Sequence, residues 1–312
     1  MSIFKQNLIS ENQLLYKSGD TGISLTLKRE DLLDTEVSGN KFRKLKYNLL
    51  SAEATKKDKL LTYGGAFSNH IAATAKAGNL MGMQTIGIIR GEELGFDLKK
   101  TLQQNATLRF ATNEGMQLKF IPRSIYKEKT TANFRESILK EFTGYYELPE
   151  GGTNELAIEG CKEILSSGDE KFDFICCSAG TGGTAAGIIE ASENHQHTLV
   201  FSALKGDFLS EEIAQYTRKK NWTLITSYHF GGYAKVSEKL VEFINTFKLK
   251  YQIQLDPIYT GKMLFGLEEM MKNGYFSKNT RILAVHTGGL QGIAGVNARL
   301  KKQNIPLIAY DD

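Results

Sequence analysis

Lys41 is the first candidate for chemistry because it directly follows the turn-forming segment Ser38-Gly39-Asn40 and opens an apolar helical stripe. A lysine held at such a turn can be shifted toward its neutral form, and a neutral amine can form a Schiff base with a carbonyl. For this position alone, a solvated surface lysine is the simpler interpretation. Lys44 and Lys46 lie off the stripe, and we expect both to be solvated.

A glycine-rich segment follows an apolar strand predicted over 172–177 and opens a predicted helix. It reads Ser178-Ala179-Gly180-Thr181-Gly182-Gly183-Thr184. Its backbone amides can surround a phosphate, and the two threonines add hydroxyl donors. The segment also fits a dinucleotide-binding pattern, but the acidic residue expected at the tip of the next strand is absent. The Walker pattern fails, because Ile188 stands where it requires lysine.

Four further segments carry weaker signals. In Gly64-Gly65-Ala66-Phe67-Ser68-Asn69-His70 a strand ends and a helix begins, and the free N–H groups of that helix suit a carboxylate or a phosphate. Helix capping by Ser68 or Asn69 is the simpler interpretation. A Ser-His hydrolase is disfavoured, because residues two apart on a helix do not face each other and no G-x-S-x-G elbow is present. Thr287, a strand-end hydroxyl followed by glycines, could contact a bound ring. For Thr287, and for Tyr233 and Tyr259 in their glycine-containing turns, an ordinary turn or packing is the simpler interpretation.

These segments are separated by alternating strand-like and helix-like stretches, which favour an α/β fold with parallel sheets. Strands are expected over 59–63, 84–90, 117–121, 172–177, 198–203 and 281–286, and helices over 69–81, 97–110, 131–142, 154–166 and 184–192. A break with one proline and two glycines falls at 148–154 and separates two α/β units. Ligands of such sheets lie at the carboxyl ends of the strands.

Bulk properties narrow the class of protein. The chain has 312 residues and a net charge of +4, which is too small and too dispersed to favour nucleic acid. No secretory signal and no apolar run of the ~20 residues that span a bilayer are evident. The three cysteines, Cys161, Cys176 and Cys177, indicate reduced core residues in a cytoplasmic protein, with neither a disulfide framework nor a metal site.

A Schiff-base lysine with a separate phosphate cradle is typical of enzymes that use pyridoxal 5'-phosphate (PLP). In the order of its segments the chain resembles the PLP-dependent fold-type II family of D-cysteine desulfhydrase and 1-aminocyclopropane-1-carboxylate (ACC) deaminase. The resemblance runs from Lys28-Arg29-Glu30-Asp31 to His286-Thr287-Gly288-Gly289. It implies a tryptophan synthase β-like fold of two three-layer α/β units with mostly parallel sheets. It also implies a larger PLP-binding domain (1–42 and 152–312), a smaller inserted domain (43–151) and a homodimer.

The resemblance also implies roles for the candidate residues. Lys41 would carry PLP and then act as the general base at Cα. Asn69 would bind the phenolic oxygen, Ala179, Gly180, Thr181, Gly182, Gly183 and Thr184 the phosphate, and Thr287 the ring. Ser68, Asn69 and His70 would meet the substrate carboxylate, and Tyr233 and Tyr259 would line the substrate pocket. The catalytic set is therefore Lys41, Ser68, Tyr233 and Tyr259.

Three motifs favour the desulfhydrase. One is Ser68-Asn69-His70, which the desulfhydrases share. The deaminases have Tyr-Glu and His-Leu-Gly-Gly where this chain has Tyr259-Thr260 and His286-Thr287-Gly288-Gly289. The chain departs from the family at Phe67, where glutamine is common, and at Ala72 and Ala73, where an arginine often follows. We expect β-elimination of D-cysteine to pyruvate, ammonia and sulfide. ACC deamination to 2-oxobutanoate, another β-substituted D-amino acid, a nucleotide-binding oxidoreductase and a non-catalytic phosphate-binding module remain as alternatives.

Overall fold

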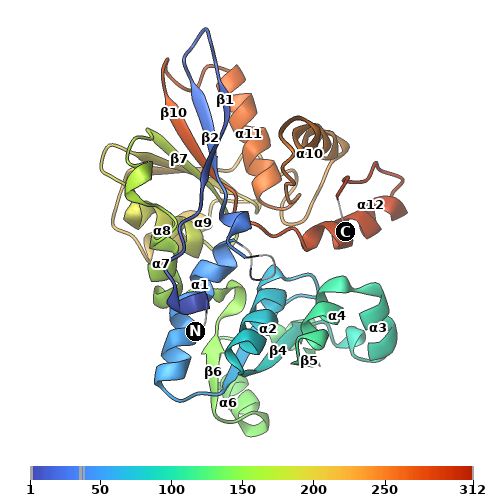
Figure 1. Ribbon diagram of the computed structural model, residues 1–312. Helices are drawn as coiled ribbons and strands as arrows, with labels where there is room; N and C mark the ends of the chain where they lie inside the picture. The colour runs from blue at the N-terminus through green and yellow to red at the C-terminus, as the bar shows by residue number, and fades with distance from the viewer. Residues whose placement is uncertain (1–2, 35–36, 38, 311–312) are drawn as a thin grey trace.

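The computed structural model describes residues 3–310 except 35, 36 and 38, so Ser38 of the lysine turn lies outside the described residues. Its strands form two separate sheets, one in the upper and one in the lower half of the view in Figure 1. In the larger sheet the order is β1 (Asn12–Lys17), β2 (Ser24–Lys28), β10 (Arg281–Val285), β7 (Phe174–Ala179), β8 (His197–Ser202) and β9 (Trp222–Ile225). In the smaller sheet it is β5 (Met116–Ile121), β4 (Gln84–Arg90), β3 (Lys59–Gly64) and β6 (Tyr145–Leu148).

Both sheets are built almost entirely from parallel pairs. Among the described strands, only β1 runs antiparallel to its neighbour. Parallel strands need helical crossovers, and these helices cover both faces of each sheet. The adjacent residues Cys176 and Cys177 illustrate the result, because they point to opposite faces of β7 and belong to two different apolar clusters. The expected layered α/β architecture is therefore present around both sheets.

The helices divide between the sheets. The larger sheet packs against α7 (Glu155–Lys162), α8 (Gly183–Ala191) and α9 (Leu209–Ala214) on one face, and against α10 (Glu238–Tyr251), α11 (Thr260–Lys272) and α12 (Gly292–Lys302) on the other. The smaller sheet packs against α1 (Asn40–Ala54), α2 (Asn69–Met81) and α4 (Ala106–Asn113) on one face, and α5 (Arg123–Tyr126) and α6 (Ala132–Glu141) on the other. The remaining elements are α3 (Leu98–Gln104) and the short 3-10 turns Ile3–Lys5, Glu30–Leu32, Glu92–Leu94, Glu150–Gly152 and Ser167–Asp169.

Two expected helices differ from those in the structure. The helix expected over 97–110 is two helices, because Asn105 ends α3 and caps α4 by accepting a hydrogen bond from the N–H of Leu108 at 2.9 Å. The helix expected over 154–166 already ends at Lys162. By contrast, α2 has the expected limits, because Ser68 caps its first turn and Gly82 ends it in the left-handed conformation.

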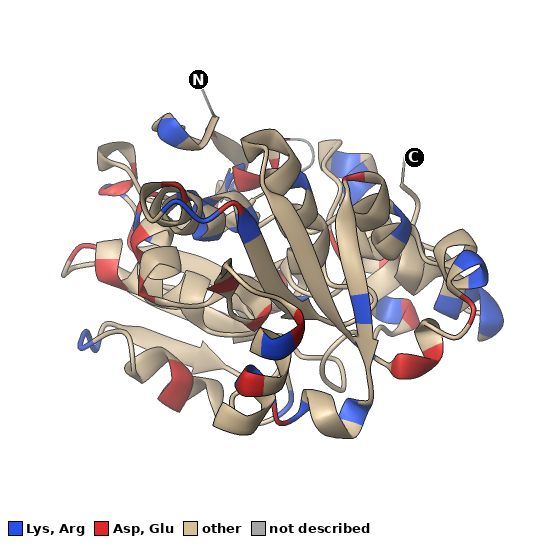
Figure 2. Cartoon of the chain, turned by 90° about the horizontal axis from the view of Figure 1, so that it is seen from below, with Lys and Arg blue, Asp and Glu red and all other residues tan. Residues whose placement is uncertain are grey.

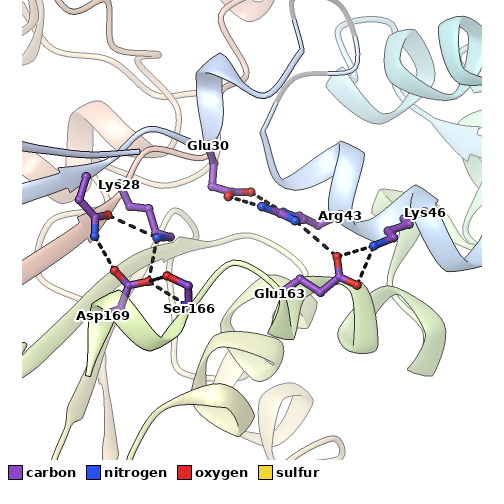
Figure 3. A network of polar contacts seen from close by, with 8 residues as sticks. Lys28, Glu30, Arg43, Lys46, Glu163, Ser166 and Asp169 are labelled. Atoms are coloured by element: carbon purple, nitrogen blue, oxygen red, sulfur yellow. Dashed lines mark hydrogen bonds and ion pairs between the residues drawn. The ribbon is translucent and has the colours of Figure 1, made fainter. Parts of the chain in front are cut away.

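A buried ion-pair network joins the start of α1 to the larger sheet (Figure 3). Arg43 and Glu30 are both fully buried, and the guanidinium donates two hydrogen bonds of 2.9 Å to the carboxylate. Arg43 also contacts Glu163 of the segment after α7, which in turn pairs with Lys46 at 2.7 Å. The expectation of a solvated Lys46 is therefore wrong. Since Arg43 lies two residues after Lys41, this network fixes the part of α1 that carries the lysine.

Charged residues of both signs are interspersed along the outer helices and loops (Figure 2). This agrees with the small net charge of +4. Among the described helices, none is both long enough and apolar enough to cross a bilayer.

Candidate active site

A cavity of about 500 Å³ lies at the carboxyl ends of strands from both sheets. Gly65 follows β3 and Arg90 ends β4 in the smaller sheet, while Gly180 follows β7 and Thr287 follows β10 in the larger one. This is the edge at which parallel α/β sheets bind ligands. The volume suits a cofactor with a small substrate.

The cavity brings together nearly all of the site residues predicted from the sequence. Its wall includes Lys41, Ser68, Asn69, His70, Ala179, Gly180, Thr181, Gly182, Thr184, Tyr233, Tyr259 and Thr287. Gly183 is the exception. It begins α8 and lies close to Thr153. A Cβ at position 183 would be only 2.7 Å from Cγ2 of Thr153. Sequence patterns did not single out Lys44, Arg90 and Glu150, which also line the cavity.

Lys41 is positioned by contacts between the start of α1 and the larger sheet. Gly39 has a positive φ of 61°, and a Cβ there would lie only 2.0 Å from the carbonyl oxygen of Thr287. Asn40 donates a 2.8 Å hydrogen bond from Nδ2 to Oγ1 of Thr184. The Lys41 Nζ itself donates to the carbonyl of Gly151 at 3.3 Å. Glycine is therefore required at position 39 both by the backbone angle and by the close approach.

The Lys41 amine is held in an environment that favours its neutral form. Burial first, and then the nearby charge of Lys44, lower the pKa of Lys41 to about 7. An amine with such a pKa is largely available as a nucleophile or a base near neutral pH. The requirement inferred from the sequence, a lysine that can lose its proton, is thus met by the geometry.

Lys44 is buried at the cavity, so the expectation that it is solvated is wrong. Its side chain is 2% exposed, and Nζ donates to the carbonyl of Gly151 at 3.1 Å and to Oγ1 of Thr153 at 2.8 Å. A further bond of 3.3 Å reaches Oγ1 of Thr181 in the glycine-rich segment. Burial lowers its pKa to about 8. The spacing contained a usable signal, because residues three apart lie on the same face of a helix.

The glycine-rich segment presents backbone amides that suit an anion, with the ammonium group of Lys44 beside them. Gly182, with a φ of 77°, is the N-cap of α8, and the first N–H groups of the helix have no partner within it. The N-terminal end of a helix also attracts negative charge through its dipole. Since Lys44 contacts Thr181 directly, its ammonium group adds charge to the same site.

Ser68 and Asn69 begin α2 on the opposite sheet. Ser68 caps the helix, and its Oγ accepts from the N–H of Ile71 at 3.4 Å. Asn69 donates from Nδ2 to the carbonyl of Gly289 at 3.4 Å, whereas its buried Oδ1 has no hydrogen-bond partner among the described residues. Ser178 has a similarly unpartnered buried hydroxyl at the cavity. Buried polar atoms are normally satisfied, so both groups are available to a bound molecule.

His70 lines the cavity as a neutral group. The Thr62 hydroxyl donates its only hydrogen to the carbonyl of Leu148 at 3.1 Å. Thr62 Oγ1 must therefore accept from Nε2–H of His70, at 2.8 Å. Burial and the charges of Lys41 and Lys44 hold the pKa of His70 well below its usual range. A positively charged anchor for a substrate carboxylate is therefore not provided here.

Two tyrosines form one wall of the cavity. The rings of Tyr233 and Tyr259 meet edge to face, with centroids 6.3 Å apart. Burial and Tyr233 raise the pKa of Tyr259 well above its usual range, so its phenol stays protonated. The buried Lys262 holds the loop of Tyr233, donating from Nζ to the carbonyls of His229 and Gly232, both at 2.9 Å.

The strand-end hydroxyl predicted to meet a bound ring belongs to a threonine pair. Thr287 lines the cavity, and Thr260 lies buried behind it with 3.5 Å between the two Oγ1 atoms. The carboxylate of Asp256 accepts hydrogen bonds from the backbone N–H groups of 258, 259 and 260, each at 2.8 Å. Of the described side chains in the wall, Glu150 is the only carboxylate.

A family model described as "Pyridoxal-phosphate dependent enzyme" matches residues 8–288. The chain belongs to this family. The protein named "Bifunctional D-cysteine desulfhydrase/1-aminocyclopropane-1-carboxylate deaminase, mitochondrial" of Arabidopsis thaliana is 32% identical over 87% of this chain and 74% of its own length. "D-cysteine desulfhydrase" of Klebsiella pneumoniae is 27% identical over 91% of this chain and 92% of its own.

Solved structures agree with this assignment. A crystal structure of an "ACC deaminase homologue" superposes with a TM-score of 0.77 at 26% identity, covering 95% of this chain and 94% of that chain. The predicted PLP fold type II, with two three-layer α/β units and mostly parallel sheets, is confirmed. PLP is the cofactor of this enzyme family. The alternatives of a nucleotide-binding oxidoreductase and a non-catalytic phosphate-binding module are no longer supported, because neither gives Lys41 a role.

The residues of the cavity fit PLP. Lys41 offers an amine with a pKa of about 7 for the aldehyde, and the start of α8 with Lys44 offers an anion site for the phosphate. Asn69 and Ser178 offer buried polar atoms that lack partners among the described residues. The aldehyde and the phosphate of the cofactor thus each have a matching group.

The lowered pKa of Lys41 predicts how cofactor uptake by the apoprotein depends on pH. The neutral fraction of an amine with a pKa of about 7 rises about tenfold from pH 6 to pH 8 and then levels off. We expect the rate of cofactor attachment, followed by stopped-flow absorbance, to show this profile. In Lys44→Met, which removes the neighbouring charge but not the burial, the midpoint should move to higher pH. A wild-type midpoint above pH 9 would contradict the prediction.

Proposed function

We propose that this PLP-dependent enzyme is a lyase for small β-substituted amino acids, with D-cysteine as the leading substrate and pyruvate, ammonia and sulfide as products. The observation that carries the proposal is the cavity wall, in which the amine of Lys41, the start of α8 and the hydroxyl of Thr287 lie together, with the Thr260 hydroxyl buried behind Thr287. Hydroxyls occur where, by the family resemblance, ACC deaminases have a carboxylate and a leucine. The names of the Arabidopsis and Klebsiella relatives support the same substrate.

We assign the cofactor contacts from the family resemblance, applied to residues that line the cavity. Lys41 Nζ would bond the aldehyde carbon, and Asn69 would bind the phenolic oxygen. The backbone of 179–184, with the Thr181 and Thr184 hydroxyls and Lys44, would bind the phosphate. Thr287 would face the ring. When bound, PLP supplies the electron sink that makes the Cα–H of an attached amino acid acidic.

The chain supplies the base, the anchor and the exclusion of water. Lys41 would accept the Cα proton, for which its pKa of about 7 is suited. The N–H groups at the start of α2, with Ser68 and Asn69, bind the substrate carboxylate. Tyr259, whose phenol stays protonated, can donate a hydrogen bond to the departing sulfur. Overall, D-cysteine and water become pyruvate, ammonia and hydrogen sulfide, with the Cβ–S electron pair leaving on sulfur.

Incubation of the holoenzyme with D-cysteine tests this proposal. We expect sulfide and pyruvate in equal amounts, at a turnover of at least about 1 s⁻¹, because most enzymes reach this rate on their own substrates. L-Cysteine and free PLP without protein serve as controls for stereochemistry and for uncatalysed elimination. Absence of sulfide from D-cysteine, with the cofactor fully bound, would contradict the desulfhydrase assignment.

ACC deamination is the second candidate, because the Arabidopsis relative carries both activities in its name. The products distinguish the two, since ACC yields 2-oxobutanoate and D-cysteine yields pyruvate. Keto-acid assays on ACC and on β-chloro-D-alanine complete the panel. Turnover of ACC alone would favour the deaminase.

We also propose that the two sheets belong to two domains, formed by 1–42 with 152–312 and by 43–151. The distribution of strands supports this division, since all strands of the smaller sheet lie between 59 and 148. Helix α1 runs without interruption across the boundary at 42/43.

A homodimer is proposed from the family resemblance, and sedimentation analysis tests it. The three free, buried cysteines favour a cytoplasmic location.

A further inference from the structure

A second cavity, of about 430 Å³, adjoins the candidate active site. We call it the vestibule; it is lined by Gly65, Ala66, Phe67, Arg90, Leu94, Arg123, Tyr126, Lys127, Lys129 and Glu150. Five of these residues, Gly65, Ala66, Phe67, Arg90 and Glu150, also line the first cavity. Because the two cavities share these residues, a molecule bound at Lys41 can extend into the vestibule.

The vestibule is strongly basic. Its wall carries four cationic side chains and one carboxylate. Lys129 pairs with Glu150 at 3.1 Å, and Arg123 pairs with Glu93 outside the vestibule. This leaves Arg90 and Lys127, for which the structure gives no carboxylate partner among the described residues. The vestibule thus has spare positive charge.

Arg90 occupies the junction of the two cavities. It ends β4, and its guanidinium lies 5.7 Å from the ring centroid of Tyr126. A Cβ built on Gly65, three residues before the cap of α2, would lie 3.4 Å from Nη2 of Arg90. Burial raises the pKa of Tyr233, and the charge of Arg90 opposes that rise, so this charge acts inside the first cavity as well.

We propose that the vestibule binds a second anionic group, at the far end of the substrate side chain, and that Arg90 determines this specificity. The proposal rests on the proposed function, because it assumes that an amino acid is bound at Lys41. The planar guanidinium suits carboxylate, sulfonate and phosphate groups alike, since each offers two oxygens. The substrate class is an amino acid whose β-substituent ends in such a group.

The elimination chemistry accommodates this class without a further reactant. With O-phospho-D-serine, Lys41 takes the Cα proton, the Cβ–O bond breaks, and its electron pair leaves on the phosphate. Water then gives pyruvate, ammonia and phosphate. Phe67, which lines both cavities, borders the aliphatic part of the side chain.

Binding to the holoenzyme tests the proposal. D-Serine and O-phospho-D-serine differ only in the second anionic group, and their dissociation constants can be read by stopped-flow from the change in cofactor absorbance that precedes turnover. We expect the phosphorylated ligand to bind more tightly to the wild type. In Arg90→Gln its affinity should fall roughly 10- to 100-fold more than that of D-serine, as for loss of a charge-assisted hydrogen bond. Arg218→Gln removes the same charge from an exposed site outside both cavities and should leave both constants unchanged.

Several outcomes would overturn the proposal. One is an equal loss for both ligands in Arg90→Gln, which would place Arg90 at the α-carboxylate or in the fold. Another is no preference for the phosphorylated ligand in the wild type. A third is competition by inorganic phosphate at equal concentration, which would mean that the vestibule binds free anions. Failure of the proposed function is a separate result, because it appears as missing keto acid and leaves these binding constants measurable.

Discussion

Lys41→Ala is expected to fold and to lose at least about 10³-fold of the turnover, because both the attachment point of the cofactor and the general base at Cα are removed. Wild-type protein should be yellow and should keep its cofactor after borohydride reduction, with the added mass located on Lys41. The variant should release PLP on dialysis after the same treatment. Lys99→Ala, at an exposed position of α3, is the matched control and should behave as wild type. An undiminished rate in Lys41→Ala would contradict the assignment of the site.

Glu30→Gln is expected to lower the free energy of unfolding by about 3–5 kcal/mol, since it leaves the fully buried Arg43 without its main counter-charge. Urea denaturation measures this loss. Glu136→Gln makes the same chemical change in an exposed pair with Lys140 and should cost about 0–1 kcal/mol. Equal losses in the free energy of unfolding for the two substitutions would show that burial of the Arg43–Glu30 pair does not increase the cost of removing Glu30's charge.

The same pair also predicts a selective rescue. Replacing both partners with apolar residues, as in Glu30→Leu with Arg43→Met, should recover part of the lost stability, because no unpaired charge then remains in the core. Activity is expected to recover less than stability, since the two directed hydrogen bonds of the guanidinium hold the turn of α1 that carries Lys41. Thermal unfolding and turnover, measured on the same preparations, separate the two effects.

The parts of the site that were predictable from the sequence are those built from local backbone chemistry. The limits of α2 follow from Ser68 and Gly82, and the glycines before α8 indicate that the chain turns there. Lys44 was missed because a lysine near an apolar stripe is usually solvated, and only the fold reveals that Thr153 and Thr181 lie above it. Arg90 was missed although it ends a predicted strand, the place where ligands bind.

Contacts between distant segments account for the remaining differences. The break at Asn105 is a capping event within one apolar run, and hydrophobic periodicity alone could not separate α3 from α4. The burial of Lys46 depends on Glu163, which lies 117 residues away in the chain. The domain limits at 42/43 and 151/152 are still a prediction.

The position of β10 has a consequence for biosynthesis. This strand pairs with β2 on one side and β7 on the other, and Thr287 just beyond it lies against Gly39. A nascent chain therefore cannot complete its central sheet, or fix the amine two residues after Gly39, until nearly all of these residues have left the ribosome. Vitamin B6 loading should accordingly be a late, post-translational event, and folding slow, as expected where β10, near the end of the chain, must pair with β2, near its start.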